Sequence, residues 1–215
     1  MDVLISASKS FRFRDKVLKL TQYLAMFLAH YGKACRWYRK STIEAFRKWQ
    51  KGVSTGRKAG KIGNFLLEMR KAYIELSKSN ILLAIARTSM FIFFIYENLI
   101  YLTKIHLLRL DSRKLKIISN KFRAAAAFMF AYDQIRCIPS ALRLGAVERR
   151  IKMRSLAMAL TKLACDIVVA MEKSFFQELF NDGIGDGMQS VFAMCSSLFV
   201  LHEVWEGIAG AKHTR

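Results

Sequence analysis

The segment Val53–Leu76 most constrains what this chain can form, because its apolar residues recur at the spacing of one helix face. It reads VSTGRKAGKIGNFLLEMRKAYIEL. The stripe consists of Ile62, Leu66, Met69, Tyr73 and Leu76, and Phe65 widens it. Two interpretations stay open. The helix lies in a membrane interface, or it docks its stripe on the protein's own core.

Basic residues occupy the rest of this helix, and they favour a membrane with an acidic surface. An interfacial helix places its apolar side in the acyl boundary and its cations against anionic headgroups. We predict that the inserting residues are Ile62, Phe65, Leu66, Met69 and Tyr73. The predicted lipid-binding cations are Arg57, Lys58, Lys61, Arg70 and Lys71.

The whole chain is both apolar and basic. Hydrophobic residues make up 53% of its 215 residues, yet the formal net charge is +20. Residues 1–80 hold 18 of the 36 Lys and Arg but 5 of the 16 Asp and Glu. Such a chain fits an acidic membrane surface, or nucleic acid within a larger assembly. We therefore predict a basic amphipathic helical region at 1–80 and a membrane-embedded helical region at 81–215.

Two further amphipathic helices are expected in the basic region, at Phe11–Tyr31 and Lys33–Gln50. In the first, Asp15 is expected as an N-cap or first-turn acid. In the second, tryptophans stand among lysines and arginines, which is typical of the headgroup zone. A nucleic-acid stacking surface would show the same combination.

The segment Ile81–Leu102 is long enough to cross a bilayer core of about 30 Å at 1.5 Å per residue. Arg87 and Glu97 lie within it, and Asn98 follows. Three interpretations remain: a span whose polar residues face protein partners, a buried hairpin, or a core helix.

A second span is predicted at about 187–208, because no Asp, Glu, Lys or Arg occurs from Gly187 to His202. Its small residues Ala193, Ser196 and Ser197 offer a face for close helix packing. The predicted fold is all-α: a helical membrane protein with N-terminal amphipathic helices and one or two transmembrane or membrane-embedded helices.

Catalytic and metal-binding patterns are absent from the sequence. The four cysteines are scattered, which favours reduced, buried thiols, and the four histidines are isolated. There is no nucleophile elbow, Walker lysine or paired-histidine zinc motif. We predict a protein that is not an enzyme and that holds no metal and no cofactor.

Five segments together resemble the peroxin eleven family of the peroxisomal membrane. The first, Phe11–Leu28, contains Arg14, Asp15, Lys16, Gln22 and Tyr23 at the family's positions. The others are VSTGRKAGKIGNFLLEMR, FIFFIYENLIYL, LACDIVVA and a C-terminal apolar segment that ends in Val-Trp. Their order and spacing match over nearly the whole chain.

The resemblance implies a peroxisomal, or glycosomal, membrane protein with its termini in the cytosol. It implies that the amphipathic helix bends the membrane and promotes organelle elongation, proliferation and fission. It also implies self-association and contact with dynamin-type fission machinery, with anionic phospholipid as the surface and no nucleic acid. Two alternatives stay open: a pore for small metabolites, supported by Arg87, Glu97 and Asn98, and a basic RNA- or ribosome-associated protein.

Overall fold

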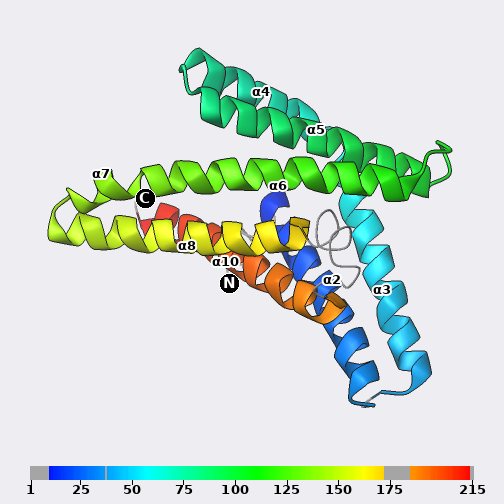
Figure 1. The fold of residues 1–215 in the computed structure, drawn as a ribbon. Coiled ribbons are helices and arrows are strands. Elements are labelled where there is room, and N and C mark those ends of the chain that lie inside the picture. Colours follow the sequence, from blue (N-terminus) through cyan, green and yellow to red (C-terminus); the bar gives the residue numbers. More distant parts are fainter. Residues whose placement is uncertain (1–9, 37, 172–184, 214–215) are drawn as a thin grey trace. The chain divides into compact units, whose positions relative to one another are not determined.

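The computed structural model describes residues 10–36, 38–171 and 185–213, and within these ranges the chain forms helices and no strand (Figure 1). The helices are α2 (Phe11–Ala34), α3 (Lys40–Ala59), α4 (Asn64–Ser77), α5 (Ile81–Lys104), α6 (Ser112–Arg136), α7 (Ile138–Leu142), α8 (Ala146–Met171) and α10 (Gly185–His213). This confirms the predicted all-α fold. The chain forms two compact units, and a boundary between them lies between Arg57 and Lys58, within α3.

The first unit joins the two ends of the chain, because α2 packs against α10. The two helices run in opposite directions: Gly187 lies against His30, and Lys19 donates a 3.2 Å hydrogen bond to the hydroxyl of Ser196. Ser10 caps α2 by accepting from the N–H of Phe13. The capping role expected for Asp15 is therefore wrong. Its carboxylate is buried in the helix interface instead.

Small side chains allow α2 and α10 to approach closely. Ser190, Ala193, Ser196 and Ser197 are each 0% exposed on α10. Ala25 and Ala29 are buried on α2. The packing face predicted around Ala193 is thus confirmed, and it is the kind of face that lets helix backbones come together in membranes.

A larger side chain in this interface is expected to destabilise the first unit. Ala193→Leu should lower the free energy of unfolding by about 1–3 kcal/mol, because overpacking forces helices apart or side chains off their rotamers. Thermal unfolding of the full chain in detergent, followed by circular dichroism, measures the loss. Ala164→Leu, at an exposed site on α8, makes the same chemical change and should leave stability nearly unaltered.

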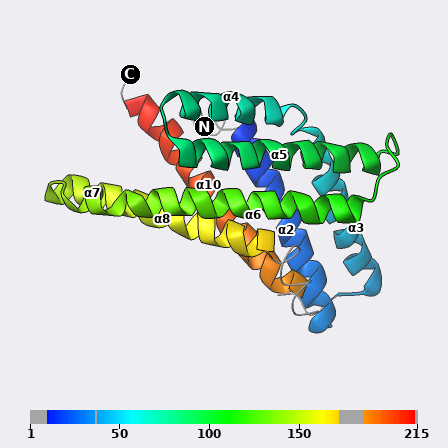
Figure 2. The ribbon, with the colours of Figure 1, turned by 45° about the horizontal axis from the view of Figure 1, so that its top comes forward.

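The second unit is a row of helices in the order α4, α5, α6 and α8, in which each packs on the next (Figures 1 and 2). Short connections make successive neighbours antiparallel. Buried alanines fill the row, including Ala84 and Ala86 on α5 and Ala126 on α6. Pro139 lies in the first turn of α7, where a missing N–H costs nothing. The chain turns there from α6 into α8.

One described helix, α5, is long and apolar enough to cross a membrane by length and composition. Its 24 residues extend about 36 Å at 1.5 Å per residue. The predicted span at 187–208 lies within α10, which does not meet the same test. Polar residues of α10, such as Gln189 and Ser190, lower the apolar content of this helix, and both are buried in the first unit.

The expected single helix over Val53–Leu76 is wrong. Helix α3 ends at Ala59, and α4 begins at Asn64 after a turn that contains Gly60 and Gly63. Gly63 has φ +84°, a left-handed conformation that glycine adopts without steric cost. The two glycines thus separate the stripe of α4 from the helix that precedes it. The division at residue 80 into a basic amphipathic and a membrane-embedded region stays a prediction.

Candidate membrane-binding helix

Helix α4 packs on α5 through a face that contains an acidic residue. Glu68 is 7% exposed. Its carboxylate oxygens lie 2.6 Å from Nζ of Lys71 and 3.2 Å from Nη1 of Arg87. Beside this pair, the ring centroids of Phe65 and Phe91 are 6.2 Å apart. The docked side of α4 therefore includes an ion-pair cluster and an aromatic contact.

The opposite face of α4 is apolar and exposed. Tyr73 is 73% exposed and Leu66 is 54% exposed, although both are large hydrophobic side chains. The complete exposed set is Ile62, Leu66, Leu67, Met69, Tyr73, Ile74 and Leu76, with Ile62 in the turn before the helix. A helix on a water-soluble protein usually has the reverse arrangement, with its apolar stripe toward the core. A contiguous exposed patch of this kind marks an interaction surface.

Four of the five residues predicted to insert lie on or beside this exposed face. Ile62, Leu66, Met69 and Tyr73 are exposed, as insertion requires. Phe65 is only partly exposed and contacts Phe91, so it belongs to the docked edge. Within the second unit, the stripe does not dock on the core.

The five predicted lipid-binding cations fall into two groups. Arg57 Nε lies 3.0 Å from Asp15 Oδ1, and the two side chains are each 10% exposed. Lys58 Nζ lies 3.0 Å from Glu97 Oε1, where the side chains are 13% and 17% exposed. These two cations are structural in this arrangement. Arg70 and Lys71, by contrast, are exposed on α4, and Lys61 is partly exposed in the turn.

The polar residues within α5 meet protein partners. Arg87 contacts Glu68 on one side, and its guanidinium lies 4.8 Å from the ring centroid of Phe130 on α6. Glu97 is paired with Lys58. The side-chain oxygen of Asn98 is buried, with no hydrogen-bond partner among the described residues. The charges of α5 therefore face other helices, as expected for a span with protein partners and equally for a core helix.

Two adjacent cations at the end of α3, one in each compact unit, contact residues of the sequence motifs. Arg57 Nη1 also donates a 2.8 Å hydrogen bond to Oε1 of Gln22. Arg57 thus holds two residues of the motif that opens α2, Asp15 and Gln22. The next residue, Lys58, holds Glu97 of the aromatic-rich motif on α5. The spacing of these motifs along the chain therefore corresponds to contacts in the fold.

Comparison with family models gives a match to peroxisomal biogenesis factor 11 (PEX11) over residues 1–205. The chain belongs to the PEX11 family. No curated protein and no solved structure matches it. Membership of the PEX11 family implies a role in peroxisome biogenesis and proliferation, and an association with the peroxisomal membrane. The family consists of biogenesis factors and is not known for enzymes.

Sequence reasoning missed some residues of this surface. Leu67 and Ile74, seven positions apart, extend the exposed face, and that spacing alone could have revealed them. Glu68 was also missed as the partner of Arg87. The sequence signal for Glu68 is its position on the side of the helix opposite the apolar stripe. That position indicates which side of α4 meets other helices.

The ion pair between Glu68 and Arg87 is expected to hold α4 on α5. Glu68→Ala leaves Arg87 without its carboxylate in an apolar helix, and should loosen α4 by about 1–3 kcal/mol after solvent screening is considered. Hydrogen exchange of the α4 amides in the full chain measures this. The double variant Glu68→Leu/Arg87→Met should recover most of the protection, because the unpaired charge is gone. Additive losses in the two single variants and the double would contradict the coupling.

Proposed function

We propose that α4 is a membrane wedge that elongates the peroxisomal membrane and promotes peroxisome proliferation and fission. Its apolar face enters the acyl boundary of one leaflet, which adds area on that side and favours curvature. At about 21 Å for 14 residues, the helix is shorter than a bilayer core of about 30 Å, so it suits the interface better than a span.

The observation that carries this proposal is the inverted orientation of α4. Glu68 faces α5, while Leu66, Met69 and Tyr73 face outward. The outward face would be costly in water, but it is complementary to lipid. The partner helix α5 is the candidate span, so α4 is attached to an element that can itself enter the bilayer.

Charge on the same helix supports an anionic membrane as the partner. Arg70 lies among the outward apolar residues, and its long side chain can bury its stem while the guanidinium reaches the headgroups. Lys71 is 50% exposed, and Lys61 precedes the helix. Each basic residue near an anionic surface contributes about 1 kcal/mol. The lipid-binding roles predicted for Arg57 and Lys58 are not part of this proposal, because internal carboxylates hold both.

The full chain reconstituted with vesicles of graded phosphatidylserine content tests the wedge. Electron microscopy should show tubules that lengthen as the anionic fraction rises, and added salt should shorten them because it screens exposed charges. Round vesicles at every composition would remove the wedge from consideration.

Family membership supports the finer parts of the proposal. We propose that the chain acts at the peroxisomal or glycosomal membrane with its termini in the cytosol, that it forms homo-oligomers, and that it engages dynamin-type fission machinery. A pore for small metabolites has less support. Two of its three supporting residues, Arg87 and Glu97, are paired with carboxylate or ammonium groups of neighbouring helices.

A further inference from the structure

A second exposed apolar surface lies where α6 turns through α7 into α8. We call it the α7 tip and define it as residues 135–152. Val147 is 74% exposed and Ile151 is 67% exposed, one helical turn apart on α8. The exposed large apolar side chains of the α7 tip are Ile135, Leu142, Leu144, Val147 and Ile151. None of these residues belongs to the wedge.

Basic residues alternate with these apolar side chains. The exposed cations of the α7 tip are Arg136, Arg143, Arg149, Arg150 and Lys152, and Glu148 is its one exposed acid. Among the described residues, no carboxylate pairs with any of these five cations. Some charges of this unit are instead neutralised within the protein, as in the 3.0 Å pair between Arg123 on α6 and Asp166 on α8.

The α7 tip lies at one end of the second unit. Within the second unit, the α7 end of the α6–α8 pair extends past the end of the α4–α5 hairpin (Figures 1 and 2). The first two turns of α8 are exposed around nearly their whole circumference, and the first side chain of α8 that is buried is Leu156.

We propose that the α7 tip is a second, independent anionic-lipid contact, separate from α4. Exposed aliphatic side chains interleaved with arginines that pair with no carboxylate of the described residues suit the acyl boundary and phosphate layer of a bilayer. Arginine presents a planar set of donors that matches phosphate oxygens. A nucleic acid would use the cations, but it would leave Val147, Ile151 and Leu142 without a partner, since aliphatic side chains give bases no stacking surface.

Hydrogen exchange of the full chain tests this proposal. The chain is reconstituted in vesicles of phosphatidylcholine alone or of phosphatidylcholine mixed with phosphatidylserine. Amides of residues 142–152 should be more protected on the anionic vesicles, and salt should reduce the difference. Equal protection on both vesicle types would overturn the proposal. So would stronger protection by a single-stranded RNA oligonucleotide than by anionic vesicles.

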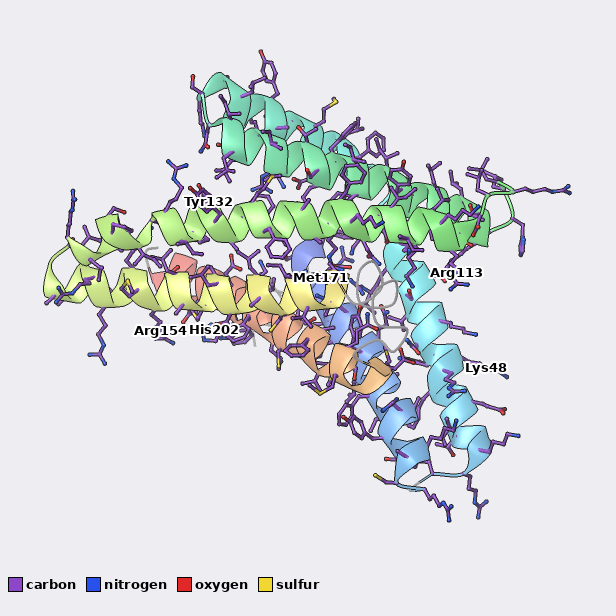
Figure 3. All side chains as sticks on the ribbon, in the orientation of Figure 1. Lys48, Arg113, Tyr132, Arg154, Met171 and His202 are labelled. Atoms are coloured by element: carbon purple, nitrogen blue, oxygen red, sulfur yellow. The ribbon has the colours of Figure 1, made fainter. Side chains whose placement is uncertain are left out.

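A matched pair of variants separates local binding from net charge. Arg149→Gln/Arg150→Gln removes two cations from the tip and should reduce the anionic-dependent protection by about 30-fold, at about 1 kcal/mol per cation. Arg47→Gln/Lys48→Gln makes the same charge change at exposed positions of α3, from which Lys48 projects outward (Figure 3), and should leave tip protection unaltered. An equal loss in both variants would assign the effect to net charge and refute the site.

The apolar part of the contact has its own test. Val147→Ser/Ile151→Ser keeps every cation and should also weaken protection of the tip on anionic vesicles. Unchanged protection would overturn the mixed apolar and ionic contact. Failure of this site is distinguishable from failure of the wedge. In the Leu66→Asp/Met69→Asp chain, tubules should be lost while protection of residues 142–152 persists.

Discussion

We expect Leu66→Asp/Met69→Asp to abolish the conversion of anionic vesicles into tubules by the full chain. Both side chains are about half exposed in the structure, so substitution removes few contacts within the protein. The variant should therefore fold, and its helix content by circular dichroism should match the wild type.

The substitution has two effects, the loss of apolar side chains and the gain of carboxylates, and together they set the size of the expected change. Full burial of a Leu or Met side chain stabilises by about 1.5–3 kcal/mol. Because each side chain is half exposed, insertion into the membrane would contribute about half of that at each position. Each Asp adds a carboxylate that is opposed by anionic headgroups and costs about 2.5–3.5 kcal/mol deep in the bilayer. The sum exceeds about 5 kcal/mol, or more than a thousandfold in occupancy of the inserted state.

Two control variants make the result specific. Leu66→Phe/Met69→Leu keeps the face apolar and should keep the tubules. Phe128→Asp changes an exposed apolar residue of α6, outside both the wedge and the candidate span, and should reduce tubulation less. Tubules of normal length from the Leu66→Asp/Met69→Asp chain would falsify the wedge.

Helix positions were largely predictable from the sequence, because each helix carries its own local signals. The apolar run that begins at Ile81 defines α5, and Pro139 marks the turn from α6 into α7 and α8. The break between α3 and α4 was not predicted, since Gly60 and Gly63 are compatible with a helix that has small residues on one face. The left-handed conformation of Gly63 belongs to the turn and leaves no periodic signal.

The orientation of each helix and its packing partners were less predictable than its position in the sequence. A stripe from Leu66 to Leu76 predicts a helix equally well whether lipid or protein covers it, so the sequence left both open. Which face of α4 meets α5 depends on Arg87 of α5. Arg87 lies 19 positions from Glu68 and forms a hydrogen bond with it, so the face of α4 that contains Glu68 packs on α5. The four cysteines illustrate the same limit. All were expected to be buried, but Cys35 is exposed and Cys165 is buried.

The pairing of the chain's two ends was not predictable either. Lys19 and Ser196 are 177 positions apart, and neither has a motif that points to the other. The small residues of α10 predicted a close packing face but not its partner. Polar residues of α2, among them Lys19 and Gln22, are buried because α10 and Arg57 supply their hydrogen-bond partners.

Arg57→Ala is expected to destabilise the first unit by about 3 kcal/mol or more. The substitution leaves the carboxylate of Asp15 and the amide oxygen of Gln22 buried without the guanidinium that satisfies both. Removing one partner of a buried ion pair costs about 3–5 kcal/mol, because the remaining charge loses the opposite charge that offsets its desolvation. Unfolding of the full chain in detergent, followed by circular dichroism, measures the loss.

This prediction separates a structural Arg57 from a lipid-binding one. If the guanidinium serves the fold, Asp15→Leu/Arg57→Met should recover most of the stability, since buried ion pairs can be replaced by apolar residues with little cost. Arg70→Ala, at an exposed position, should leave stability within about 0.5 kcal/mol of the wild type and should weaken binding to anionic vesicles. The opposite pattern, in which Arg57→Ala leaves stability intact and weakens lipid binding, would return Arg57 to the membrane surface. Under the arrangement described, the adjacent Arg57 and Lys58 each neutralise an acid that a different helix buries, so neither cation is available at the surface.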